Sequence, residues 1–311
     1  MLFIRTALLF IVFAMAFALP ATAAAQVAPA SLPGDAVWYL HADLQELRDA
    51  QSGRHLYQWL EREVFDDILE DLGIDLSKEA SRVTAFADAS LGTVIVVDGA
   101  ITETTRDKLL ALASMDSKLD TLKHGGKTYY HSERKNSRSH GNRSFDDLEK
   151  TAYFSFDVKN KLIVASDPDQ MKALLESGGR IAGSQSHPGT LLVLTADKSF
   201  VQAGARTAAF ADDDDQGWDS NILRNTELVA LLVSDRNGLI AVEAQLVSHE
   251  PTMAQSLGGI INGLLSLQAL NPDLDPDILA LMRNTKIDVK DKVLSINAVI
   301  NPEMIVKMLD D

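Results

Sequence analysis

The chain contains no cysteine in its 311 residues. This absence excludes disulfide bonds, catalysis by a thiol and a lipid attached to an N-terminal cysteine. Common catalytic motifs are missing as well: the chain has no G-x-S-x-G, no H-E-x-x-H and no phosphate-binding glycine loop. Ser132 and Lys135 spell S-x-x-K, but they lie in a polar segment without a companion K-T-G. The sequence therefore favours a protein that is not an enzyme and uses no cofactor.

Basic residues are scarce. The chain has 29 lysines and arginines against 44 aspartates and glutamates, which gives a net charge of −15. A protein this acidic is repelled by nucleic-acid phosphates and by anionic lipid headgroups, so we expect neither as a partner. Apolar residues make up 46% of the chain, which is typical of folded globular proteins and excludes wholesale disorder.

Residues 1–25 have the pattern of a secretory signal peptide. A basic start, MLFIR, precedes an apolar run at 7–19, and small residues up to Ala25 supply a cleavage site. The run is shorter than the ~20 residues that a membrane-spanning helix needs. We expect cleavage near Ala25, a periplasmic or secreted location and no integral membrane span afterwards. Loss of Arg5 lowers the net charge from −15 to −16.

Two segments of the chain are similar: AYFSFDVKNKLIVASDPDQMKALLE at 152–176 and KIDVKDKVLSINAVINPEMIVKMLD at 286–310. Each predicts a strand, a polar turn at Asp-Val-Lys, a second strand and a helix that begins at proline. Asp157 of the first segment corresponds to Asp288 of the second. A further strong hairpin signal is the D-R-N-G turn at 235–238.

The order of predicted elements repeats along the chain, since a hairpin at 83–101 corresponds to one at 228–246. We therefore predict an α+β fold with an internal duplication. After a flexible leader at 26–34, a first lobe covers 35–187 and a second covers 188–311. Each related lobe is expected to be an antiparallel sheet with helices packed on one face, and the lobes either share one sheet or face each other across a cleft. The alternative is that composition alone makes the two halves alike.

The segment Lys123–Arg143 is polar and basic, and we interpret it as a loop. Its imidazoles, with Glu133, have the chemistry to bind zinc or copper, although six cations in the segment oppose a divalent ion. Its cations alternatively contact an anionic partner, or the loop is simply solvated. The metal candidates are His124, His131 and His140. The partner-contact candidates are Arg134, Lys135 and Arg138.

An acidic run, Asp212–Asp215 with Asp219, follows in the second half. Calcium takes several carboxylate oxygens, but the spaced D-x-D-x-D-G pattern is absent, and four consecutive side chains cannot all point at one ion. A hydrated charge run is the favoured interpretation.

An apolar helix is predicted at 253–270, with apolar residues on more than one face. It is either buried between the lobes or presents a contact for an apolar ligand or partner helix, through Leu257, Ile260, Ile261 and Leu264.

These observations predict an exported, non-enzymatic protein that acts by binding or assembly in the bacterial cell envelope. The alternatives are a metal-dependent periplasmic hydrolase that uses the three histidines, and a carrier of an apolar ligand held at 253–270.

Overall fold

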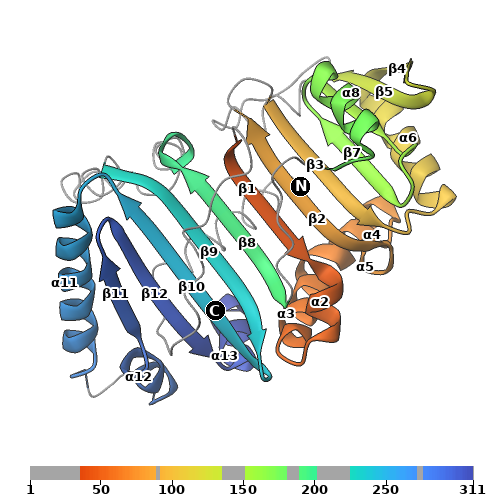
Figure 1. Ribbon diagram of the computed structural model, residues 1–311. Coiled ribbons are helices and arrows are strands. Elements are labelled where there is room, and N and C mark those ends of the chain that lie inside the picture. Colours follow the sequence, from red (N-terminus) through yellow and green to blue (C-terminus); the bar gives the residue numbers. More distant parts are fainter. Residues whose placement is uncertain are drawn as a thin grey trace.

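One antiparallel sheet of twelve strands organises the molecule in the computed structural model (Figure 1). The structure describes residues 36–88, 92–134, 151–180, 189–201, 225–271 and 276–310. The strand order is β11-β12-β10-β9-β8-β1-β2-β3-β7-β6-β5-β4. The α+β class and the antiparallel pairing are as predicted, and the sheet is continuous from one end of the molecule to the other.

The half of the sheet from β1 to β4 comes from the first part of the chain. Its strands are β1 (Ala36–Asp43), β2 (Ala80–Asp88), β3 (Gly92–Gly99), β4 (Ser117–His124), β5 (Lys127–Arg134), β6 (Thr151–Ser155) and β7 (Lys161–Ala165). Its helices are α2 (Leu44–Asp49), α3 (Gly53–Leu60), the π-helical turn η1 (Glu61–Phe65), α4 (Asp66–Leu72), α5 (Leu76–Glu79), α6 (Glu103–Asp116) and α8 (Pro168–Ser177).

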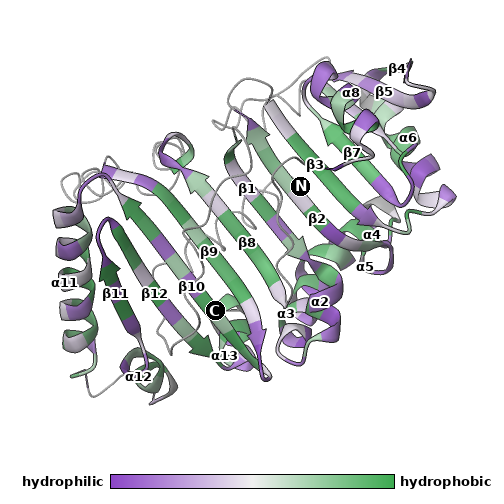
Figure 2. Cartoon of the chain, viewed as in Figure 1, coloured by the Kyte–Doolittle hydropathy of each residue, from purple (hydrophilic) through white to green (hydrophobic). Residues whose placement is uncertain are grey.

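The other half comes from the second part of the chain. Its strands are β8 (Thr190–Asp197), β9 (Thr226–Arg236), β10 (Leu239–Ser248), β11 (Lys286–Lys290) and β12 (Val293–Ile300). Its helices are α11 (Pro251–Gln268), α12 (Pro276–Arg283) and α13 (Pro302–Asp310). Figure 2 shows strands that are mostly hydrophobic, with β4 and β5 at one end more hydrophilic than the rest.

Local signals set the ends of several helices. Asp43 caps α2, because its carboxylate accepts a hydrogen bond from the Glu46 amide at 2.8 Å. Thr102 caps α6 through the Thr105 amide in the same way. Gly73 ends α4 with φ +65°, a conformation that favours glycine. Asp, Thr and Gly are residue types that favour these positions at helix ends.

Neighbouring residues of β3 point to opposite sides of the sheet and identify its two faces. Val97 lies in a core cluster with Val83, Val233 and side chains of α2 and α3, so this side is named the α3 face. Val233 also packs against the cluster of Ile305 in α13, which places α13 on the α3 face as well. Strand register then places α12 and α11 on this face too, through Leu281 of α12 and the Val289 side chain beneath α11.

The opposite side, named the α8 face, carries Val94, Val96 and Ile163 against Met171 and other side chains of α8. The expectation of helices on one face therefore fails for α8. The strand that leads into α8 ends on Ala165, which points to the α8 face, and the helix folds back over that face.

The two halves meet where β1 pairs antiparallel with β8, from Trp38 opposite Ala196 to Ala42 opposite Leu192. The β9–β10 turn reinforces this junction. The Ser52 hydroxyl, which is fully buried, donates to the Asp235 carboxylate, and the Ser52 amide donates to the same oxygen at 3.2 Å. A second-half hairpin is thus fastened to the α2–α3 turn of the first half.

The Asp-Val-Lys repeat has different surroundings in its two copies. Asp157 lies after β6, where its carboxylate accepts from the Thr128 amide at 2.5 Å, whereas Asp288 lies inside β11. Three residues further on the copies agree, because Asn160 and Asp291 both have left-handed backbones, with φ of 57° and 53°.

Candidate binding surface

Helix α11 stands out because it carries no charged side chain along Pro251–Gln268. Its first half packs on the sheet: Ala254, Leu257 and Gly258 are buried. A Cβ on Gly258 would lie 2.6 Å from the Val289 side chain of β11, so the helix approaches the strand closely at this point.

The second half of α11 exposes large apolar side chains. Leu264 is 56% exposed, Leu267 is 68% exposed, and Leu270, just beyond the helix, is 79% exposed. At ~100° per residue, Leu264 lies about 70° from the centre of the buried stripe, and Leu267 lies about 130° away, on the side of the helix that faces away from the sheet. The three exposed leucines are named the leucine stripe. Helix α11 lies at one end of the sheet (Figure 1).

The candidate contacts of this helix divide into core and surface. Leu257 is only 6% exposed and belongs to the core, whereas Ile260 and Ile261 are half-buried and Leu264 is exposed. Sequence analysis missed Leu267 and Leu270 as contacts. The three-residue spacing of 264, 267 and 270 was a usable signal, because residues three apart are neighbours on the surface of a helix.

The basic segment Lys123–Arg143 is not a loop in the part that the structure describes. Residues 123 and 124 end β4, Gly125 and Gly126 form a turn with φ of 57° and 79°, and β5 runs from Lys127 to Arg134. The glycine pair was the hairpin signal, because both turn residues have positive φ. The candidates Lys135, Arg138 and His140 lie outside the described residues, as does the acidic run at 212–219.

The two described histidines of this segment have separate partners. The His124 ring is 2.6 Å from the Glu176 carboxylate of α8. His131 stacks on Tyr153, with ring centroids 4.7 Å apart, and lies 3.8 Å from the Asp120 carboxylate. His131 lies opposite Asp120, which is four residues from His124 along β4, a separation of roughly 13 Å. Among the described residues, no group of three or more metal-binding side chains is arranged to hold an ion.

Asp120 is the charged centre of this edge of the sheet. Lys118 donates to it at 2.7 Å, and this hydrogen bond, with a smaller contribution from His131, lowers the pKa of the Asp120 carboxyl. Both side chains are solvent-accessible, so the pair contributes little to stability.

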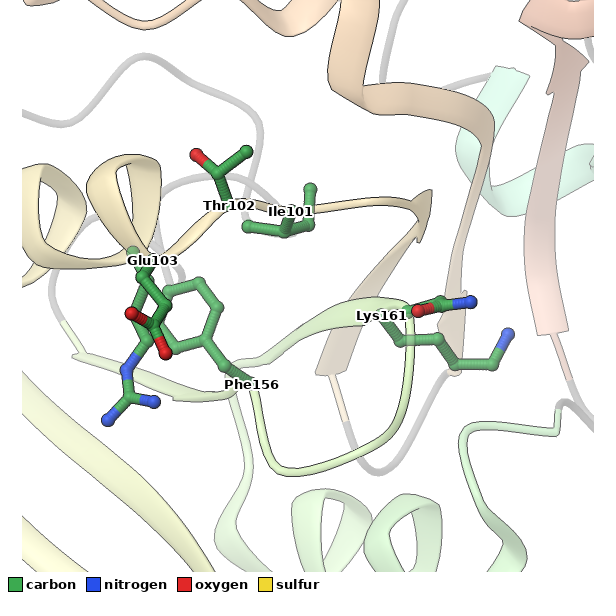
Figure 3. Close-up of a pocket in the computed structure, with 7 residues that line it drawn as sticks. Ile101, Thr102, Glu103, Phe156 and Lys161 are labelled. Atoms are coloured by element: carbon green, nitrogen blue, oxygen red, sulfur yellow. The ribbon is translucent and has the colours of Figure 1, made fainter.

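A small cavity of about 120 Å³ lies where α6 begins beside the β6–β7 loop (Figure 3). Phe156 lies between the α6 residues and Lys161, which forms an ion pair with Asp98. Arg106 and Glu103 bring charges of opposite sign to the same wall. Nothing in this arrangement favours a ligand of one charge.

One carboxyl is buried on the α8 face of the second half. Glu243 in β10 is 9% exposed and accepts a hydrogen bond from the Gln245 amide at 2.7 Å. Burial raises the pKa of the Glu243 carboxyl, and the bond from Gln245 partly opposes this shift.

His41 and Asp43, which lie two residues apart on β1, do not form a catalytic pair. The His41 ring is hydrogen-bonded to the Thr84 hydroxyl at 2.8 Å, while Asp43 caps α2.

The chain therefore folds as an α+β protein with one large sheet, and it exposes the apolar side chains of the leucine stripe. No model of a known protein family matches the chain, and no curated protein matches it. The crystal structures of TP0453 resemble it: form IV has a TM-score of 0.48 at 13% identity and covers 91% of this chain and 98% of that chain. Form III has a TM-score of 0.46 at 13% identity, covering 90% and 98%, and form I has 0.42 at 14%, covering 92% and 97%. Likeness at this level carries no argument about function.

Within the residues that the structure describes, no helix combines the length and the hydrophobicity needed to cross a bilayer.

Proposed function

We propose that this chain is an exported, non-enzymatic protein of the bacterial cell envelope that acts by binding an apolar partner through the leucine stripe of α11. The observation that carries the proposal is the exposure of Leu264 and Leu267, at 56% and 68% on a helix without charges, and of Leu270, at 79% just beyond it. Contiguous exposed apolar residues mark contact sites, because leaving them in water costs roughly 25 cal/mol per Å².

Export is the part of the proposal that rests on sequence alone. The signal-peptide pattern of residues 1–25 predicts that the exported chain begins near Gln26. Fractionation of cells that express the full chain, with N-terminal sequencing of the product, tests it. Recovery of an uncleaved chain in the cytoplasm would contradict export.

Internal duplication is proposed as the origin of the fold. The strand order β1-β2-β3-β7-β6 in the first half has the same sequence of connections as β8-β9-β10-β12-β11 in the second. The amide of Gly99, at the end of β3, donates to Asn160, and the amide of Ser248, at the end of β10, donates to Lys292. The opposite placement of α8 and α13 is the main difference between the proposed copies.

The binding test replaces all three leucines together. In Leu264→Ser/Leu267→Ser/Leu270→Ser the helix keeps its buried stripe, so the fold should persist. We expect binding of the neutral apolar probe N-phenyl-1-naphthylamine to weaken at least about fivefold, because its apolar contact area is lost. Native mass spectrometry of the purified wild-type protein should also detect a co-purified apolar ligand or partner.

A matched control changes the polar side of the same helix. Thr252→Ser/Gln255→Asn alters two exposed residues of α11 and should leave probe binding unchanged. Equal binding by the leucine variant and the wild type would remove the leucine stripe from the proposal.

The metal-dependent hydrolase stays an alternative from sequence, with His124 and His131 as its described candidates. Zinc or copper bound in less than one equivalent after reconstitution would end it.

A further inference from the structure

The two ends of the sheet are edge strands. Within the part of the chain that the structure describes, β11 pairs only with β12, and β4 pairs only with β5. An edge strand offers unpaired backbone N–H and C=O groups to another strand. Because all twelve strands alternate in direction, a second copy placed beside the first in the same orientation brings its β4 antiparallel to β11.

In such an arrangement the α8 faces of the two copies lie on the same side of the joined sheet, and so do their α3 faces. Following the cross-strand pairs from β4 to β11 shows that Lys118 and Asp120 lie on the α8 face. The same chain of pairs places Lys286 and Asp288 on the α8 face at the other end of the sheet. In antiparallel pairing, directly opposite residues share a face, so these four charges meet on one side.

The charges at the two edges are complementary in one register. Lys286 opposite Asp120 places Asp288 opposite Lys118 on the α8 face. Between these pairs, Ile287 lies opposite Leu119 on the α3 face, where both side chains are half-buried in the single molecule. A shift of two residues would place Asp288 opposite Asp120 and Lys290 opposite Lys118, which is repulsive. The charge pattern therefore selects both the partner strand and the register.

Pairing of like edges over their full length is disfavoured. In β11 against a second β11, Asp288 lies opposite itself and Lys286 lies opposite Lys290. In β4 against a second β4, Lys118 lies opposite Lys123. Like charges directly opposite each other destabilise a sheet, so full-length pairing favours β11 with β4.

We propose that the partner of this protein is a second copy of the same chain, added edge to edge by antiparallel pairing of β11 with β4. The inference goes beyond the proposed function, because this contact is made by the backbone and charged side chains of the edge strands and not by the leucine stripe. The contact is head-to-tail, so it repeats into an open, twisted ribbon of sheet rather than closing as a dimer. Figure 1 shows α11 beside β11, at the end of the molecule to which the copy is added.

Charge swaps test the contact. Lys286→Asp/Asp288→Lys reverses the β11 edge, and Lys118→Asp/Asp120→Lys reverses the β4 edge. By sedimentation velocity at low salt, the wild type should form larger species as its concentration rises towards about 1 mM, and 0.5 M salt should reduce them. Each variant alone should associate at least about tenfold more weakly, because two attractive pairs become repulsive.

An equimolar mixture of the two variants should associate as the wild type does, since every edge then meets a complementary edge. The matched control Asp169→Lys/Lys172→Asp reverses an exposed ion pair on α8 without changing either edge strand, and should leave association unchanged. A wild type that stays monomeric to 1 mM, a single swap that associates normally, or a mixture that does not recover would each overturn the proposal.

The two proposals fail separately. Probe binding tests the leucine stripe in monomers, and a wild type that binds the probe but does not associate would overturn only the β11–β4 contact.

Discussion

The units β6–β7–α8 and β11–β12–α13 are written in similar sequence but place their helices on opposite faces of one sheet. β7 has five residues and ends on Ala165, which points to the α8 face. β12 has eight residues and ends on Ile300, which points to the α3 face. In each unit the helix covers the face to which the last residue of its strand points.

The difference shows that strand length decides the face while the repeated sequence decides the elements. Side chains alternate along a strand, so a change of three residues in strand length reverses the side on which the chain leaves the sheet. The apolar residues of the following helix then fix that choice, through Leu174 and Leu175 in α8 and Ile305 in α13.

Truncating the core of α8 should have the largest effect. Leu175 is 1% exposed, and Leu175→Ala should lower the free energy of unfolding by about 3 kcal/mol, from lost burial and a cavity. Urea denaturation measures this.

Ile305→Ala in α13 is the corresponding change on the other face, and we expect a similar loss, since Ile305 is 4% exposed. A loss below about 1 kcal/mol for one helix alone would show that it is not fixed to its face by this core.

Glycine substitutions in α11 test how the second unit is covered. Gly258→Ala should destabilise the protein by about 2 kcal/mol, because the added methyl group meets Val289 at 2.6 Å. Gly263→Ala is the control: a Cβ there meets nothing within 4 Å, so better helix propensity should stabilise by about 0.5 kcal/mol. Thermal unfolding measures both changes. If both substitutions raised the melting temperature, or both lowered it, this packing would be contradicted.

Much of the local structure could be predicted from sequence, because its causes are local. The D-R-N-G turn at 235–238 occurs as predicted, and Asp43, Thr102 and Gly73 are residue types that favour the helix ends at which they lie. Strand β4 was missed, since its alternation is interrupted by Lys118, Asp120 and other charges. The face of α8 could not be predicted, because it depends on where β7 ends against β3.

The candidate site was only partly predictable for a similar reason. An uncharged helix was evident, and Leu264 was among its proposed contacts. Which flank meets the sheet depends on the approach of Gly258 to Val289, and no local pattern encodes a contact between residues so far apart in sequence. Leu257, a contact candidate under the alternative to burial, is buried.

Loosening the junction between halves should have a moderate effect. Ser52→Ala removes the hydroxyl that donates to Asp235 but leaves the Ser52 amide bond, so we expect a loss of about 1–2 kcal/mol in urea denaturation. Ser256→Ala removes an exposed hydroxyl of α11 and should change stability by less than about 0.5 kcal/mol. Equal effects would mean that the hairpin is not held by this bond.

The smallest expected effect concerns Glu243, on the α8 face of the second half, where α8 itself does not reach. Burial raises the pKa of this carboxyl, so the folded protein holds the proton more tightly than the unfolded chain. The stability that the protonated Glu243 carboxyl contributes is fully present below the pKa of the unfolded chain. It is lost as pH rises through the pKa of the folded protein, where a charge must be buried.

Glu243→Gln keeps an oxygen for Gln245 and carries no charge, so its melting temperature should exceed that of the wild type by a few degrees at pH 7 and equal it near pH 3.5. Glu303→Gln, on the exposed side of α13, controls for the loss of one negative charge. A lower melting temperature for Glu243→Gln at pH 7 would show that the carboxylate is charged and compensated, and that this face is covered differently from the face beneath α8.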